Sequence, residues 1–136
     1  MSKLFMGGVA LAGAIFFAVA VHAQGGAASA PAMKNPAPPT AASVTAGAAA
    51  YKKYCLFCHG ADAKGNGPLA PQGSNPPDLT DATWTHGSTD GEIFTVMSNG
   101  AGAGSAMIPF KGKMPDRDLW NIINFLRSVG PKGAER

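Results

Sequence analysis

The sequence predicts an all-α fold in which a few helices are joined by long loops. Three segments carry helical signals, and no segment shows the apolar–polar alternation of a half-buried strand. Between the helical segments the chain is rich in glycine and proline, which interrupt regular structure. Long loops are uncommon in a small compact domain unless a further group organises them.

The first element is an apolar segment at the N-terminus. Lys3 precedes an almost unbroken apolar run over residues 4–21, which ends in small residues around Ala23. This pattern is typical of a secretory signal peptide over residues 1–23, so we expect the protein to be exported to the periplasm. An uncleaved membrane anchor stays open as an alternative, because the run approaches the roughly 17 residues that span a bilayer.

The next segment, residues 24–43, consists mainly of Ala, Pro, Gly and Ser and contains no aromatic residue. This composition is typical of a flexible linker. We therefore place the folded domain at residues 44–130 and a C-terminal tail at residues 131–136.

Two helices are expected in the first part of the domain. The first runs from about Thr45 to the cysteine pair. The second lies in the segment STDGEIFTVMSNG, where Thr89 and Glu92 have the spacing of a capping box and Gly100 supplies a stop. The apolar residues expected to be buried in it are Ile93, Phe94 and Met97.

The third helix is expected from about Asp116 to Gly130. Asp116 and Asp118 suit the positive N-terminal end of a helix. The apolar residues follow the i, i+3, i+4, i+7 spacing of one buried face, and they are Leu119, Ile122, Ile123 and Leu126.

The only two cysteines of the chain, Cys55 and Cys58, lie in the segment YCLFCHG, and His59 follows directly. An oxidising compartment would pair two such thiols unless another chemistry uses them. A zinc site needs four ligands, and the adjacent Cys58 and His59 are poorly placed to bind one ion. A redox dithiol normally begins a helix after a strand, whereas this motif ends a helix.

The spacing C-x-x-C-H is typical of covalent haem c attachment. In that chemistry the thiols of Cys55 and Cys58 form thioethers with the two vinyl groups, and His59 ligates the iron. We therefore expect one covalent haem c, with Cys55 and Cys58 binding the cofactor and His59 binding the metal.

Four residues are candidates for the second axial ligand: His86, Met97, Met107 and Met114. Met97 belongs to the buried face of its helix, and His86 lies in a polar loop. Met114 directly precedes the third helix and can pack as an apolar residue there. Met107 lies in the glycine-rich segment GAGSAMIPF, which can approach a flat macrocycle closely. We favour Met107 as the iron ligand, with Met114 as the alternative.

Three stretches resemble the class I c-type cytochromes of bacterial periplasmic, monohaem type: AGAAAYKKYCLFCHGADAKGNGP, PPDLTDATWTHGSTDGEIFTVMSNG and MIPFKGKMPDRDLWNIINFLRS. The resemblance covers about residues 44–129. It implies a small cytochrome c fold of three to five helices, with long loops wrapped around one covalently bound haem. It also implies that His59 and a methionine are the axial ligands.

The resemblance further implies two contacts. Gly47 and Tyr51 of the first helix should cross the last helix at Ile122 and Phe125. The carbonyl of Pro68 should accept a hydrogen bond from the His59 ring.

The chain departs from the family pattern at two places. Ile108 separates Met107 from the following proline, whereas Met114 is followed directly by Pro115. The last helix also lacks the usual Ser or Thr cap, so Asp116 is expected to cap it.

These features predict a periplasmic one-electron carrier that is monomeric and not an enzyme. Its partners would be a donor dehydrogenase or respiratory complex and an acceptor oxidase or reductase. The alternatives are a haem subunit of a larger dehydrogenase and a ligand-binding or peroxidase-like haem protein with a displaceable methionine. The net charge of only +3, without a long basic run, argues against nucleic-acid binding.

Overall fold

The computed structural model of the protein describes residues 33–82 and 84–131. This part of the chain contains four helices and no β-strand, which confirms the all-α fold. The helices are α1 (Ala41–Tyr54), α2 (Leu56–His59), α3 (Asp90–Asn99) and α4 (Asp116–Val129). No helix in the described ranges is both long enough and apolar enough to cross a membrane. The expected signal peptide at residues 1–23 lies outside the described residues.

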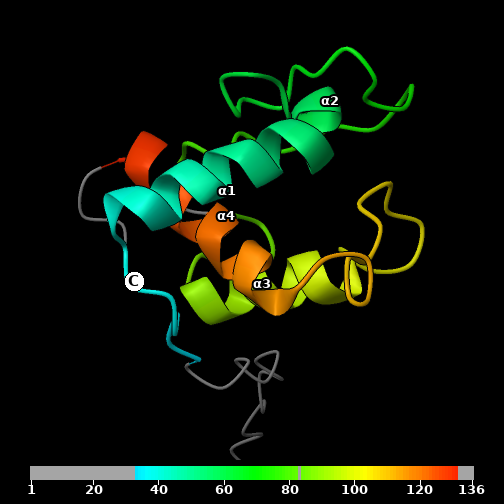
Figure 1. The fold of residues 1–136 in the computed structure, drawn as a ribbon. Coiled ribbons are helices and arrows are strands. Elements are labelled where there is room, and N and C mark those ends of the chain that lie inside the picture. Colours follow the sequence, from blue (N-terminus) through cyan, green and yellow to red (C-terminus); the bar gives the residue numbers. More distant parts are fainter. Residues whose placement is uncertain (1–32, 83, 132–136) are drawn as a thin grey trace, which may run out of the picture.

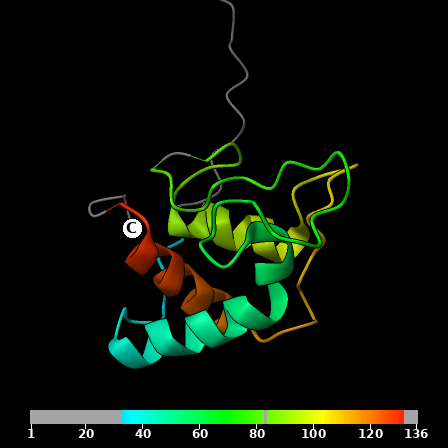
Figure 2. The same cartoon turned by 90° about the horizontal axis from the view of Figure 1, so that it is seen from above.

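The centre of the fold is the crossing of α1 over α4, with α3 on the other side of α4 (Figure 1; Figure 2). A Cβ atom at Gly47 would lie 1.9 Å from the Asn121 carbonyl oxygen, so only glycine allows the two backbones to approach this closely. One turn later, the rings of Tyr51 and Phe125 lie 5.2 Å apart. The crossing implied by the resemblance is therefore present.

The expected apolar face of α4 is buried. Leu119, Ile122 and Ile123 are the largest fully buried side chains, and Leu126 is buried beside them. Helix α3 packs on the same helix through Phe94, whose ring stacks on that of Trp120 with centroids 4.1 Å apart.

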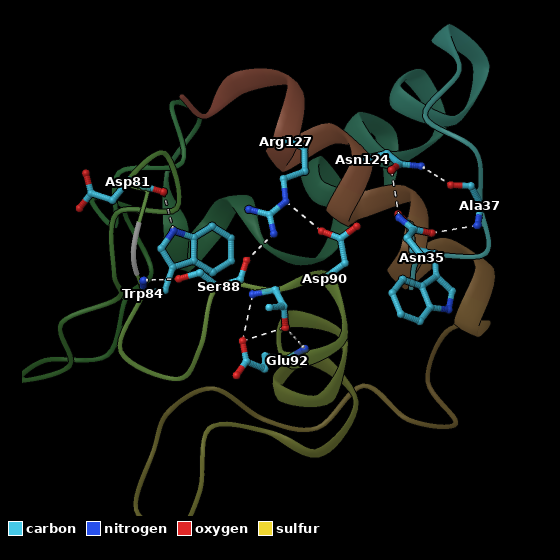
Figure 3. Close-up of polar contacts among 11 residues, drawn as sticks. Asn35, Ala37, Asp81, Trp84, Ser88, Asp90, Glu92, Asn124 and Arg127 are labelled. Atoms are coloured by element: carbon cyan, nitrogen blue, oxygen red, sulfur yellow. Dashed lines mark hydrogen bonds and ion pairs between the residues drawn. The ribbon is translucent and has the colours of Figure 1, made fainter. Parts of the chain in front are cut away.

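Helices α3 and α4 begin differently. Helix α3 has the expected capping box: the Thr89 hydroxyl accepts from the Glu92 N–H, and the Glu92 carboxylate accepts from the Thr89 N–H (Figure 3). The expectation that Asp116 caps α4 is wrong, because Pro115 occupies the cap position and makes no side-chain cap. Pro115 has φ −62° and ψ 145°, so Asp116 is already the first helical residue.

Residues 33–40, which we call the N-terminal strap, lie across α4 and lead into α1. The Asn35 amide donates to the Trp120 carbonyl oxygen at 3.2 Å and to Asn124 Oδ1 at 3.0 Å. At the start of the strap, Met33 covers Gly91 at the beginning of α3, where an added Cβ would lie 2.8 Å from Met33 Cβ. The strap thus contacts the helices of the core.

Buried amides on α4 complete this contact. The Asn124 amide donates to the Ala37 carbonyl oxygen at 3.1 Å and to Ser43 Oγ at 2.7 Å (Figure 3). Ser43 Oγ in turn donates to Asn121 Oδ1 at 2.7 Å. The last part of the expected linker, residues 33–43, is therefore built into the domain, which differs from the predicted boundary at residue 44.

A buried ion pair joins the ends of α3 and α4. Arg127 Nε lies 2.9 Å from Asp90 Oδ1, and both side chains are almost fully buried. The guanidinium also donates to the Ser88 carbonyl oxygen (Figure 3). Because the pair is accompanied by a backbone hydrogen bond, the charge of Arg127 is satisfied at this site.

Candidate functional site

The cysteine–histidine motif lies at the junction of α1 and α2. Cys55 is the residue between the two helices, and Cys58 and His59 belong to α2. Cys55 and His59 are buried, whereas Cys58 is half-buried. Both cysteines are free thiols. The structure thus places all three predicted site residues on one short turn of the chain.

A loop immediately after α2 fixes the backbone of the motif. The N–H groups of Gly65, Gly67 and Leu69 donate to three successive carbonyl oxygens of α2, at 2.8, 3.1 and 2.8 Å. Their acceptors are His59, Cys58 and Phe57, respectively. A Cβ atom at Gly67 would lie 2.4 Å from the Phe57 carbonyl oxygen, so the loop approaches the motif as closely as backbone allows. The helix-terminal carbonyls are thereby satisfied by backbone donors.

Burial controls the protonation of the two inner side chains. It lowers the pKa of His59, so the imidazole is held neutral, and a nearby backbone group of Pro77 acts in the opposite direction. Burial, together with the neighbouring Cys58, raises the pKa of Cys55 to about 12. A neutral imidazole is the form that ligates a metal.

The ring of His59 lacks the hydrogen bond that the resemblance implied. Its Nδ1 is buried and has no partner among the described residues, so the expected bond to Pro68 is not formed. The backbone group that influences the ring is that of Pro77.

Met107 lies in a loop whose backbone is tied to the end of α3. The N–H groups of Phe110 and Lys111 donate to the carbonyl oxygens of Met97 and Ser98, at 2.9 and 3.1 Å. The Met107 carbonyl oxygen accepts from the Ala101 N–H at 3.2 Å.

This loop also contacts the motif. The Phe110 ring lies edge-on to that of Tyr54, with centroids 6.2 Å apart. Tyr54 directly precedes Cys55. The methionine loop and the cysteine motif are therefore neighbours in the fold.

The other candidate ligands differ from Met107 in burial, although the Met114 N–H donates to the Phe110 carbonyl oxygen of the same loop at 3.3 Å. Met114 is buried at 6% exposure within the main core, and Met97 is equally buried on α3. Met107 is only half-buried at the edge of that core. His86 is an exposed loop residue. Burial of Met114 and Met97 agrees with their expected packing roles.

The site residues fit a covalently attached haem better than the two alternatives. Within residues 33–82 and 84–131, no group of three or more His, Cys, Asp or Glu side chains gathers as a metal-binding cluster. The motif follows helix α1, and no strand precedes it in the described residues, so the setting of a redox dithiol is missing. The thiols of Cys55 and Cys58, which form no disulfide, and a buried histidine whose pKa burial lowers are the groups that haem c requires.

Comparison with protein families supports this assignment. Residues 42–126 match the family described as cytochrome C oxidase, cbb3-type, subunit III. The chain belongs to this family. It is a class I c-type cytochrome, and its cofactor is covalently bound haem c. The expected cytochrome c fold is thereby confirmed.

Solved structures of similar fold are also cytochromes or parts of larger complexes. A chain of the reducing HAO-like protein complex of Kuenenia stuttgartiensis has 25% identity and a TM-score of 0.64, over 71% of this chain and 47% of that one. Cytochrome cL of Methylophaga aminisulfidivorans has 25% identity and a TM-score of 0.56, and the match covers 66% of this chain and 55% of the cytochrome cL chain. The chain thus spans about half the length of these relatives. No curated protein matches it.

Two features of this c-type cytochrome site were missed by sequence reasoning. One is the hydrogen bonding of the loop at residues 65–69 to α2, for which the only signal was the glycine spacing in GNGP. The other is the hydroxyl group of Tyr51, which donates to the Gly60 carbonyl oxygen at 2.8 Å.

Proposed function

We propose that the chain is a one-electron carrier in which Cys55 and Cys58 attach the haem and His59 and Met107 are the axial ligands. The observation that carries this proposal is the contact between Tyr54 and Phe110, with ring centroids 6.2 Å apart. It brings the methionine loop against the motif that holds the cysteines and the histidine. We assign no catalytic residue.

Each residue has a definite role in this function. When bound, the haem would supply an iron that exchanges one electron, and an iron whose coordination is completed by the chain suits electron transfer rather than substrate binding. His59, whose pKa burial lowers, would hold the iron through its imidazole. Met107 supplies a thioether from a loop whose backbone is fixed by α3, and thioether ligation raises the reduction potential.

An exposed apolar pair marks the surface where a redox partner would dock. Phe57 is 48% exposed and Leu69 is 65% exposed, and the Leu69 N–H donates to the Phe57 carbonyl oxygen at 2.8 Å. Both flank Cys58, whose sulfur lies 3.8 Å from the Leu69 carbonyl oxygen. Exposed apolar residues that adjoin one another, rather than single ones, are typical of interaction sites. Exposed Lys52 and Lys53 at the end of α1 would favour a partner with an acidic surface.

We place this carrier in the periplasm after removal of residues 1–23. The support is the sequence pattern of the N-terminal segment, with its apolar run and small residues around Ala23. The donor would be a dehydrogenase or respiratory complex, and the acceptor a terminal oxidase or reductase. The intact mass of protein isolated from the periplasm measures both haem attachment and cleavage.

A second candidate is a haem subunit that works only within a larger complex. The family description names an oxidase subunit, and one similar structure is a chain of a protein complex. Gel filtration of the natively expressed protein separates the two candidates. A free carrier elutes as a monomer, whereas a subunit elutes with its complex.

The ligand assignment is tested by a pair of methionine variants. Met107→Ala should lose the far-red charge-transfer band of ferric iron bound to a thioether, lower the reduction potential and admit external ligands. Met114→Ala should keep the band and lose about 2–5 kcal/mol of stability, because its side chain is buried in the core.

The control variant is His86→Ala, which should leave the spectrum unchanged. The assignment is wrong if Met114→Ala loses the band while Met107→Ala keeps it. A wild-type protein that has no such band and binds carbon monoxide rapidly would favour the ligand-binding alternative.

A further inference from the structure

Tyr51 contacts the backbone on both sides of the cysteine–histidine motif. Its carbonyl oxygen accepts from the Cys55 N–H at 2.8 Å, and its hydroxyl donates to the Gly60 carbonyl oxygen at 2.8 Å. Cys55 is the first residue of the motif, and Gly60 is the residue directly after His59. Tyr51 is therefore bonded to both ends of the segment, through its backbone at Cys55 and through its side chain at Gly60.

The residue that Tyr51 holds is itself fixed in an unusual conformation. Gly60 ends α2 with φ 81°, and its N–H donates to the Leu56 carbonyl oxygen at 2.8 Å. The Tyr51 hydroxyl therefore restrains the peptide group between Gly60 and Ala61, one residue beyond His59. Because Gly60 is joined directly to His59 and its own N–H is bonded to the Leu56 carbonyl oxygen, a displacement of Gly60 would shift the His59 backbone and, with it, the imidazole ring.

Tyr51 is also held rigidly from the other side. Its side chain is only 2% exposed, and its ring lies 5.2 Å from that of Phe125 on α4. One turn earlier, Gly47 brings the two helices into backbone contact. Burial is the main factor that raises the pKa of Tyr51, so its hydroxyl stays a donor across the accessible pH range.

We propose that Tyr51 is a positioning residue for the axial histidine, because its hydroxyl transmits the rigid α1–α4 crossing to the orientation of the His59 ring. The inference rests on the proposed role of His59 as an iron ligand. Groups that orient a metal ligand tune the metal although they do not touch it.

The first test is Tyr51→Phe, which removes the hydroxyl and keeps the ring. We expect the ferric protein to remain low-spin with its thioether band, while the hyperfine-shifted haem methyl and His59 ring resonances move and the reduction potential changes. The NMR shifts depend on the angle of the imidazole plane, so a loss of stability alone would not change them.

Two control variants distinguish a change in the orientation of the His59 ring from a loss of fold stability. Tyr54→Phe removes the same atom from the neighbouring tyrosine, whose ring lies 4.8 Å from the ammonium nitrogen of exposed Lys53. Asn35→Ala weakens the fold at the strap without touching the motif. Neither should move the His59 resonances.

A second measurement keeps the Tyr51 hydroxyl and changes only its strength as a donor, so it does not depend on whether Tyr51→Phe folds. The chain has two tyrosines, so 3-fluorotyrosine incorporated into the Tyr54→Phe background labels Tyr51 alone. Fluorine beside the hydroxyl makes it a stronger hydrogen-bond donor. We expect the haem methyl resonances to shift in the direction opposite to that of Tyr51→Phe.

The outcomes distinguish this inference from the function on which it rests. If the His59 ring protons are not hyperfine-shifted in the wild type, His59 is not the ligand and both fail. If they are shifted but do not respond to Tyr51→Phe or to the fluorinated residue, the function stands and Tyr51 has a structural role only.

Discussion

The two sides of the molecule are held together in different ways. On the helix side, formed by α1, α3, α4 and the strap, the apolar face of α4 is fully covered and the buried amide of Asn124 is hydrogen-bonded. On the motif side, formed by α2 and the loops at residues 60–80 and 100–113, only His59, Gly60 and Ala63 are buried, and Phe57, Leu69 and Ile108 are exposed. The helix side has a core made of side chains.

The motif side depends on its cofactor for a core. Its loops are held by backbone hydrogen bonds, at Gly67 and Phe110 for example, and by a few apolar side chains that pack at the edge of the core. A covalently attached haem adds a large apolar surface where the chain itself supplies little. The following variants test this contrast, beginning with the largest expected effect.

Removing the attachment should affect the motif side most strongly. Cys55→Ala combined with Cys58→Ala should abolish covalent haem and leave a poorly folded chain, because so small a domain lacks sufficient core. Amide hydrogen exchange should show protection lost first in the two loops, with any remaining protection at the α1–α4 crossing. Unchanged protection in the loops at residues 60–80 would contradict the contrast.

A change at the crossing should destabilise the helix side. Gly47→Ala places a Cβ 1.9 Å from the Asn121 carbonyl oxygen, so the helices must move apart. We expect a loss of about 1–3 kcal/mol in urea unfolding, even though alanine favours the helix. Thr45→Ala, at an exposed position of the same helix, is the matched control and should change little. Equal stability of the two variants would show that the crossing tolerates a side chain.

The strap should contribute less, but measurably. Asn35→Ala removes hydrogen bonds to Trp120 and Asn124 and should cost about 1–3 kcal/mol while leaving the haem spectrum unchanged. Lys34→Ala, at the adjacent exposed residue, should stay within about 0.5 kcal/mol. If both variants match the wild type, residues 33–40 behave as a flexible linker after all.

The smallest effect concerns the exposed cap of α3. The Thr89 N–H, followed by its hydroxyl, lowers the pKa of Glu92 below the ordinary 4.5. Because the folded-state pKa is the lower one, the ionised cap stabilises the fold above pH 4.5, and this contribution is lost as the pH falls through the folded-state value. The stability difference between wild type and Glu92→Gln should therefore shrink in acid. If the stability difference between wild type and Glu92→Gln stayed constant from neutral to acidic pH, ionisation of Glu92 would not be linked to folding.

Features with local causes could be predicted from the sequence. The capping box of Thr89 and Glu92 needs only a three-residue spacing, and the buried face of α4 needs only its periodicity. The motif of Cys55, Cys58 and His59 is equally local, and the family match agrees with haem c. The ligand role of Met107 remains a prediction that rests on the position of its loop.

Features that depend on distant partners could not be predicted. Asn35 bonds to Asn124, a residue 89 positions away, and nothing in its Pro- and Ala-rich surroundings indicates that contact. The hydroxyl of Tyr51 is another case, because its acceptor is a backbone carbonyl whose position depends on the whole motif. Proline composition alone suggested a linker where the fold has an ordered strap.

The strap has a practical consequence for measurements on electrodes. It joins α1 at the end opposite the cysteine motif, and a helix of 14 residues spans about 21 Å. If the protein were attached to an electrode through the strap, the motif side would therefore face the solution (Figure 1). Electron tunnelling weakens steeply with distance, so this orientation would slow exchange with the electrode and leave the Phe57–Leu69 surface free for a dissolved partner.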